Sequence, residues 1–526
     1  MKLSRENKKE TNIITFITLN LFVFFVSVYL LTASGPNFYN TDASQLRFEV
    51  VKSIVERFDL SVPKGTGLQG SDGRDYSWLG IGSSLLAVPF YVGGEAIGVS
   101  PEIAVSIMNN LFGAATVVLV FLFSFTLGYS KRASIMAAIF YGLCTMAWPL
   151  AKHPFDHPIE TFFVLLSVYF IYLRVVGQKT VCLLLSGISL GIAYVTRPTS
   201  ILIMPSLFVF MIVYYSQKLG LKSIFKLAAR DSGLFFLSFL PFLGLSFYYN
   251  YYRFGSIFET GYSLIALRTG IKFFTGTPFV TGLSGFLLSP GKGFFFYSPV
   301  AGLFFFSVRA FLRKHPAIGF SFLSIILSYL LFLSKNMNWH GDWAWGPRYL
   351  LVVTPFLIIP LAELLDTDRW LNKSFLRWTV YFFFTLGLVI QIVAVSVNFQ
   401  KYFLILRFNE EVKFTVSRGH GVQPIVEPPA ELYFDWRKSP IPAQFKFMYK
   451  TVREIGDYGY SNSSCENTTA WKNDPNPCLA FFDFWWAQKY CLVREYLILL
   501  ISLILLSLYC ASRLCKVLGF RHVREE

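Results

Sequence analysis

The chain alternates long apolar runs with short polar gaps. A helix needs about 20 mostly apolar residues to cross the hydrocarbon core of a bilayer, and twelve runs come close to this length. They lie near residues 13–33, 103–128, 133–150, 159–176, 180–196, 199–215, 232–250, 294–312, 316–334, 348–365, 375–398 and 493–512. The pattern predicts an all-α polytopic membrane protein, built as a bundle of about twelve transmembrane helices.

The apolar stretch 79–99 differs from these runs because small and helix-breaking residues interrupt it. It contains Gly80, Gly82, Pro89, Gly93, Gly94 and Glu95. We expect a re-entrant or interfacial helix that does not cross the membrane. The later basic gaps then fall on the same side as the basic N-terminus, as the positive-inside rule requires. The chain is therefore predicted to be a multi-pass protein of the plasma (inner) membrane with both termini cytoplasmic.

This topology divides the chain into three parts. Residues 1–398 form the transmembrane module, in which residues 34–102 are the first outer loop. Residues 399–492 are polar, aromatic and rich in proline, and predict a small extracytoplasmic domain. Residues 493–526 supply the final transmembrane helix and a basic cytoplasmic tail.

Composition supports a membrane protein, since 54% of the residues are hydrophobic and 18% are aromatic. The net charge of +16 could indicate nucleic acid. Its basic residues fall mostly in short gaps between apolar runs, however, so no nucleic-acid partner is expected. Cys465 and Cys478 lie in the predicted outer domain and could form a disulfide, because disulfides persist in oxidising compartments.

Asp42 follows the first apolar run directly and precedes an amphipathic run that starts near Leu46. The spacing places a carboxylate at the outer membrane surface. Such a group can act as a general base on an acceptor hydroxyl, or as a metal ligand, for a lipid-linked substrate that arrives from the bilayer. Asp42 could equally cap the helix that follows it.

The short turn 151–158 concentrates polar residues between two apolar runs, with Glu160 just inside the second one. Its candidate substrate-pocket residues are Asp156 and His157. Such a cluster can hold a divalent ion or a phosphate, but it lacks a ligand spacing specific to any metal. The alternative is that these side chains cap two helices at the membrane interface.

Three basic residues lie at helix ends on the outer side: Arg197, Lys292 and Arg348. A single Arg or Lys at a membrane interface commonly extends its charge toward water without further function. Three of them on the side opposite the positive-inside bias favour a phosphate-binding role. The run around Lys292 is not a P-loop, because it lacks the GxxxxGK[ST] pattern.

The segment 338–346 combines three tryptophans with a histidine and an aspartate. Tryptophan faces can stack on sugar rings, but Trp-rich turns also form interfacial aromatic belts. The polar neighbours favour a carbohydrate or headgroup pocket, with Trp339, His340 and Asp342 as candidate residues.

The order of these features resembles the GT-C superfamily of membrane glycosyltransferases. The resemblance rests on the aspartate after the first helix, the amphipathic run ending in Pro63, the stretch from Tyr76 to Tyr91, the Arg197-Pro198 turn, and the Trp-rich turn leading into Gly346-Pro347-Arg348-Tyr349-Leu350. More narrowly, residues 10–400 resemble protein O-mannosyltransferases and aminoarabinose-transferase-like enzymes.

The resemblance implies a GT-C-like bundle that transfers a sugar from a polyprenyl-phosphate-linked donor to a lipid, glycan or protein acceptor on the extracytoplasmic face. Asp42 would then be the catalytic carboxylate, and Arg197, Lys292 and Arg348 would hold the donor phosphate. Many members have Asp-Glu where this chain has Asp42-Ala43, so a divalent metal remains a candidate cofactor whose requirement stays open. Which of Asp156 and His157 matches the acidic residue of related enzymes stays open.

Two other functions use the same features. A lipid-linked-glycan flippase or transporter would need polar residues in mid-membrane, and the predicted spans carry few ionisable residues at their centres. A glycan polymerase or ligase uses the same donors, and the sequence alone distinguishes it only weakly from a glycosyltransferase of the kind described above.

Overall fold

The computed structural model describes residues 2–35, 42–177, 179–217, 221–269, 276–341, 344–366, 369–399, 402, 415–417, 425–427, 430–458, 482–488 and 494–519. Within them, nine helical segments are long and apolar enough to cross a membrane: Glu10–Leu31, Pro101–Thr126, His157–Val175, Pro198–Ser216, Lys226–Phe254, Pro316–Leu333, Arg348–Asp366, Ser374–Ser396 and Leu497–Val517. The chain is thus a multi-pass integral membrane protein.

The other three ranges predicted to span the membrane are helical but shorter or broken. They are α6 (Lys131–Cys144) with α7 (Ala147–Ala151), α9 (Val181–Thr196), and α14 (Phe294–Tyr297) with η3 (Pro299–Leu303) and α15 (Phe304–Lys314). The bundle of helices is confirmed, whereas the count of twelve crossings stays a prediction.

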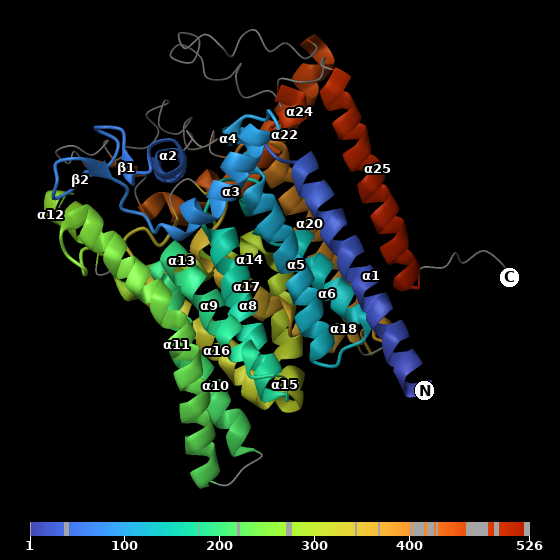
Figure 1. Ribbon diagram of the computed structural model, residues 1–526. Helices are drawn as coiled ribbons and strands as arrows, with labels where there is room; N and C mark the ends of the chain where they lie inside the picture. The colour runs from blue at the N-terminus through green and yellow to red at the C-terminus, as the bar shows by residue number, and fades with distance from the viewer. Residues whose placement is uncertain are drawn as a thin grey trace.

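The long helices form one bundle (Figure 1). Its other members are α1 (Lys2–Leu31), α5 (Met108–Thr126), α8 (His157–Val175), η2 (Pro198–Ile203), α10 (Met204–Ser216), α11 (Leu221–Phe254), α13 (Phe279–Leu288), α16 (Pro316–Leu333), η4 (Arg348–Val353), α17 (Thr354–Ile358), α18 (Leu361–Asp366), α19 (Arg369–Asn372), α20 (Ser374–Ser396) and α25 (Arg494–Val517). Helix α8 packs on α5 and α9, and α1 packs on α5 and α25.

Glycines allow two of these helices to approach closely. Gly187 and Gly191 lie one turn apart on α9, and a Cβ atom on either would collide with α11, at Phe235 or Phe242 respectively. Small residues four apart are a common device for helix packing in membranes, where apolar burial alone does not drive association.

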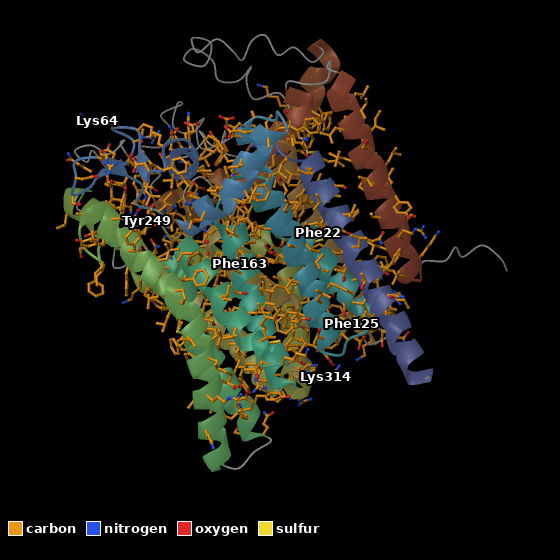
Figure 2. All side chains as sticks on the ribbon, in the orientation of Figure 1. Phe22, Lys64, Phe125, Phe163, Tyr249 and Lys314 are labelled. Carbon is orange, nitrogen blue, oxygen red and sulfur yellow. The ribbon has the colours of Figure 1, made fainter. Side chains whose placement is uncertain are left out.

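The two ends of the bundle are distinct. Lys64 and Lys314 lie at opposite ends, whereas Phe163 lies between them (Figure 2). Helix α1 ends at the end of the bundle that is uppermost in Figure 1. We call this end of the bundle the loop end. Helix α25 runs back beside α1, so the start of α1 and the end of α25 lie toward the other end (Figure 1). Their cytoplasmic location stays a prediction.

The first loop covers the loop end with short elements. They are α2 (Asp42–Arg57), the antiparallel strands β1 (Ser61–Val62), β2 (Leu68–Gln69) and β3 (Asp75–Tyr76) in the order β1-β3-β2, α3 (Gly82–Ala96) and α4 (Pro101–Ser106). A later loop contributes α12 (Tyr262–Thr269). Leu46, Val50 and Val51 are buried on one face of α2, which confirms the amphipathic run. Helix α3 (15 residues) is shorter than the candidate spans, as is α9 (16 residues), so its interfacial position stays a prediction.

The structure describes residues 399–492 in short pieces. They are β4 (Thr415–Ser417) paired with β5 (Ile425–Glu427), η5 (Ala430–Phe434), η6 (Trp436–Lys438), α22 (Pro440–Tyr458) and α24 (Trp485–Gln488). The Gly291 N–H donates to Tyr433 O over 2.9 Å, and the Trp485 indole donates to Leu30 O over 2.8 Å. A separate outer domain stays a prediction, and Cys465 and Cys478 lie outside the described residues.

Candidate functional site

Asp156 lies at the centre of a buried ionic cluster at the loop end. Its carboxylate forms one ion pair with Arg47 (Nη2–Oδ2, 2.9 Å) and another with Arg197 (Nη1–Oδ1, 3.2 Å). The His157 ring is also 3.2 Å from Asp156. Asp156 precedes α8 but forms no side-chain cap hydrogen bond, so it does not act as a helix cap.

Local backbone geometry directs Arg197 into this cluster. Helix α9 ends at Thr196, and Arg197 has an extended backbone (φ −143°, ψ 113°). The cause is Pro198, because the residue before a proline is disfavoured in the helical region. The chain therefore turns out of the helix at Arg197, which places the guanidinium group between the first turn of α8 and the start of η4.

Tyr349 joins Arg197 to Arg348. The guanidinium carbons of the two arginines lie 5.3 Å and 5.2 Å from the centre of the Tyr349 ring, which is also 5.4 Å from the His157 ring. Arg348 begins η4 and also lies over Phe155. Cation–π contacts of this kind fix the guanidinium plane without neutralising its charge.

Glu160 supplies a second carboxylate one turn into α8. Its Oε2 atom lies 3.0 Å from Arg197 Nε, and its Oε1 atom accepts hydrogen bonds from Ser200 and Tyr329 over 3.1 Å each. Only 1% of Glu160 is exposed, and these partners offset part of the cost of burying its carboxylate. Arg197 is therefore held between two carboxylates.

The cluster carries more positive than negative charge. Burial raises the pKa of Asp156, but Arg47 and Arg197 outweigh this effect, so the net pKa lies well below the usual range. Burial lowers the pKa of Arg197, whereas Asp156 and Glu160 raise it, and the net pKa lies above the usual range. Three guanidinium groups, including that of Arg348, face two carboxylates, an arrangement suited to an anion.

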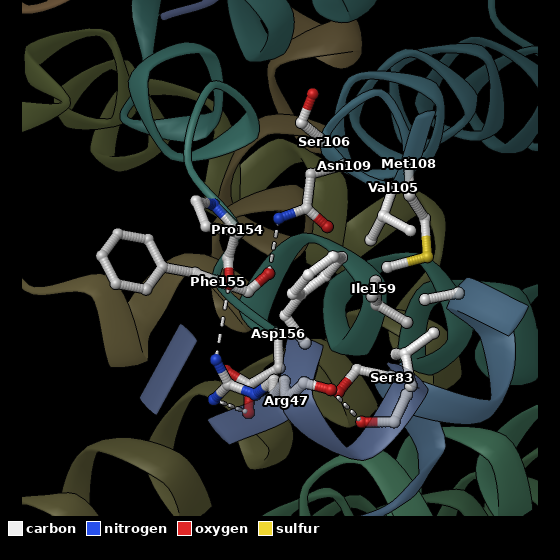
Figure 3. A pocket seen from close by; sticks show the side chains of 14 residues that line it. Arg47, Ser83, Val105, Ser106, Met108, Asn109, Pro154, Phe155, Asp156 and Ile159 are labelled. Carbon is white, nitrogen blue, oxygen red and sulfur yellow. Dashed lines mark hydrogen bonds and ion pairs between the residues drawn. The ribbon is translucent and has the colours of Figure 1, made fainter. Parts of the chain in front are cut away.

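A cavity lies on the Arg47 side of Asp156 (Figure 3). Its polar lining residues are Arg47, Asp156, Asn109, Ser83, Ser84 and Ser106, and its apolar lining residues come from α2, α3, α4, α5, α8 and the turn before α8. Arg197 does not line it. Asp156 therefore separates this cavity from the side of the cluster formed by Arg197, Arg348 and Tyr349.

Lys292 is not exposed at all and is held by the Trp-rich segment. Its ammonium group donates to Ala344 O over 2.7 Å and to Gly346 O over 3.4 Å, and it lies 5.4 Å from the Tyr433 ring. In this arrangement Lys292 stabilises the turn that precedes Arg348. Its role as a phosphate ligand stays a prediction.

Trp339 and His340 are also buried. Trp339 is 0% exposed and packs on Phe286 and Tyr433, and the His340 ring stacks on Tyr433 at 4.5 Å. Neither residue lines the cavity of Figure 3. Their assignment to a substrate pocket stays a prediction.

Two predicted site residues cannot be placed. Asp42 is the first residue of α2, but its side chain lies outside the described residues, as does Asp342. Among the residues that are described, no three His, Cys, Asp or Glu side chains are grouped to hold a metal ion.

Arg47 and Glu160 are the site residues that sequence reasoning did not select. Arg47 had a signal, because it interrupts the apolar face of α2 next to Leu46 and one turn before Val50. A charge on the buried face of an amphipathic helix needs a partner. The sequence does not show that this partner is Asp156.

Part of the chain matches a known protein family. Residues 90–244 match the family described as dolichyl-phosphate-mannose-protein mannosyltransferase. That segment contains Asn109, Asp156, Glu160 and Arg197. The chain resembles GT-C glycosyltransferases. The family match confirms the resemblance seen in the sequence motifs, although it covers only part of the GT-C-like module.

Two solved structures are similar to this chain in the course of the backbone. ArnT from Cupriavidus metallidurans bound to undecaprenyl phosphate is 15% identical, with a TM-score of 0.47 over 95% of this chain and 78% of that chain. The oligosaccharyltransferase AglB from Archaeoglobus fulgidus, in complex with an inhibitory peptide and a dolichol-phosphate, is 11% identical, with a TM-score of 0.42 over 74% and 55%. No curated protein sequence matches the chain significantly.

Proposed function

We propose that this GT-C-like protein is a membrane glycosyltransferase that moves a sugar from a polyprenyl-phosphate-linked donor to a lipid, glycan or protein acceptor on the extracytoplasmic face. The observation that carries the proposal is the buried arginine cluster around Asp156. The family matched by residues 90–244 is named for a dolichyl-phosphate donor, which has the same chemistry.

The reaction requires the cluster's positive charge. An acceptor oxygen forms a bond to the anomeric carbon of the donor sugar while the bond from that carbon to the phosphate oxygen breaks. The leaving lipid phosphate keeps the electron pair, and its negative charge grows in the transition state. Arg197 and Arg348 are fixed by Tyr349 and would stabilise this charge without reorganising. Lys292, through the turn before Arg348, would complete the phosphate-binding set.

The acceptor must also lose a proton. Asp42 is the first residue of α2, the helix that brings Arg47 to Asp156. We assign to it the role of general base, which accepts the proton of the acceptor hydroxyl. Asp156 is paired with two arginines and keeps a low pKa, which makes it a poor base and a suitable anchor for the cluster.

Transfer of radiolabelled sugar from a panel of polyprenyl-phosphate sugars, by purified protein in lipid, tests the proposal. We expect transfer by the wild type that is lost in a folded Asp42→Asn variant. Asp72→Asn is the matched control, because Asp72 is a half-exposed aspartate of the same loop whose partners are Arg74 and Tyr76. No turnover with any donor, together with headgroup-dependent movement of intact lipid between leaflets, would overturn the proposal in favour of a flippase.

A further inference from the structure

Helix α22 presents three different faces around its axis. One face is buried against the bundle: Gln444 and Thr451 are 0% exposed, and Phe447 packs on the hydrophobic core. Their spacing of three and four residues places them on one side of the helix. The rest of the helix surface, away from this face, carries an apolar row and a basic row.

The apolar row consists of Phe445, Tyr449 and Val452, which are spaced four and three residues apart. They are 40%, 70% and 54% exposed, respectively. This spacing aligns the three side chains along the helix. A continuous exposed apolar surface commonly marks a site of interaction with protein or membrane.

The basic row runs beside the apolar row. Lys446, Lys450 and Arg453 each follow a residue of the apolar row by one position, and Lys446 and Arg453 are exposed. Between positions 436 and 453 the chain has five basic residues and no acidic one. The positive-inside rule does not account for this charge, because residues 399–492 are predicted to lie on the outer side. The charge therefore favours a negatively charged partner.

The contacts of α22 place its start at the surface of the bilayer. Gln444 Nε2 donates to Val397 O, one residue after the candidate span α20 ends at Ser396. The Ser439 hydroxyl, directly before α22, donates to Pro290 O over 2.7 Å. Helix α22 lies at the loop end of the bundle (Figure 1). It is therefore held where a transmembrane helix leaves the lipid.

We propose that α22 lies in the membrane surface at the loop end and binds anionic phospholipid headgroups of that leaflet. Its apolar row enters the boundary of the acyl chains, where aromatic rings are favoured. Its basic row meets the phosphate groups. A helix that combines a basic face with an aromatic apolar face is typical of segments that lie in the interface. An acidic protein could pair with the basic row alone, but the apolar row beside it and the adjoining bilayer favour lipid.

Photocrosslinking from position 449 tests which molecule covers the apolar row. Tyr449 is replaced by benzoylphenylalanine in the full-length protein, which is reconstituted in nanodiscs of phosphatidylcholine and phosphatidylglycerol and then irradiated. Mass spectrometry should find phospholipid adducts on α22, with phosphatidylglycerol enriched above its share of the bilayer. The same probe at position 64 is the control, because Lys64 is exposed in the turn between β1 and β2 and should give few lipid adducts.

Two substitutions separate the contributions of charge and apolar contact. Lys446→Gln should lower the enrichment of phosphatidylglycerol about two- to fivefold, because each basic residue near an anionic surface adds attraction that salt partly screens. Lys64→Gln removes another exposed lysine of the loop end and should leave the enrichment unchanged. Phe445→Ser should lower the yield of all lipid adducts. Since both positions on α22 are exposed, the apparent Tm should stay close to that of the wild type.

Other occupants give different results. Adducts to another part of this chain or to a second copy would overturn the proposal, since protein would then cover the apolar row. A lack of any adduct from position 449 would also overturn it, because the row would then face water. Lipid adducts that follow the bilayer composition, unchanged in Lys446→Gln, would overturn the binding of anionic headgroups. None of these measurements requires sugar transfer, so the proposal stands or falls separately from the proposed function.

Discussion

Asp156 and Arg47 form a buried ion pair, with Arg47 Nη2 2.9 Å from Asp156 Oδ2. Arg47 belongs to the first loop, and Asp156 belongs to the turn before α8. Arg47 Nη1 also donates to Pro154 O in that turn over 3.4 Å. This contact closes helix α2 onto the transmembrane bundle and gives the candidate site its shape.

Replacing Asp156 by Asn should destabilise the protein strongly. The variant leaves Arg47 and Arg197 buried near each other without their shared carboxylate. Removing one partner of a buried charge pair typically costs about 3–5 kcal/mol. Thermal unfolding in lipid nanodiscs should show a lower apparent Tm for Asp156→Asn, partly restored by added inorganic phosphate, which supplies the missing negative charge. An unchanged Tm would show that the arginines find other compensation; the exposed Asp72→Asn serves as control.

Glu160→Gln should slow sugar transfer by roughly tenfold or more, because Arg197 loses one of its two carboxylates and faces an amide that can rotate a donor toward it. The measurement is kcat and KM for the donor in the transfer assay. Glu56→Gln is the control, since Glu56 accepts a hydrogen bond from Tyr91 (2.7 Å) but has no part in the Asp156 cluster. Equal effects of the two substitutions would argue against a positioning role for Glu160.

Substitutions of Lys152 and Asp483 should have non-additive effects on the free energy of unfolding. Their charged atoms are 3.1 Å apart, both side chains are buried, and Asp483 also accepts from Ser34 over 2.8 Å. Lys152→Met should destabilise by about 3–5 kcal/mol, because it leaves a buried carboxylate without its cation. The double variant Lys152→Met/Asp483→Leu should recover part of this loss. A double-mutant cycle of thermal unfolding checks the coupling, and additive effects would contradict it.

The protein should become less stable as the pH falls below about 6.5, because the His153 ring is buried. Burial lowers the pKa of His153 from 6.5 to about 3; Asp483 opposes this effect and Lys152 adds to it. Between these values the unfolded chain binds a proton that the folded protein does not, so acid favours unfolding by up to about 1.4 kcal/mol per pH unit. His153→Gln should flatten the fall in apparent Tm between pH 6.5 and 5. The same slope in both proteins would exclude His153 as its source.

The apolar pattern determined the class of fold because transmembrane helices follow from local composition. A long apolar run needs no knowledge of its neighbours, since the bilayer is its solvent and the helix satisfies its own backbone hydrogen bonds. Local composition likewise led to the prediction of an interfacial helix in the interrupted stretch 79–99; the structure has α3 there, and its position relative to the bilayer stays a prediction.

The sequence also selected Asp156, Arg197 and Arg348, which the structure brings to one place. The signal was again local, because Arg197 and Arg348 are basic residues at helix ends opposite the positive-inside bias, and Asp156 lies in a polar turn between two apolar runs. Their functional roles, like that of Asp42, stay predictions.

Tertiary structure alone decided which partners these residues have. The pairing of Arg47 with Asp156, the hold of Glu160 on Arg197 and the burial of Lys292 under the Trp-rich segment all join segments that are distant in sequence. The position of the cavity on the Arg47 side of Asp156, away from Arg197, follows from those contacts. Such pairings depend on how the helices pack and on which buried charges must be compensated, and neither is written in the composition of any single segment.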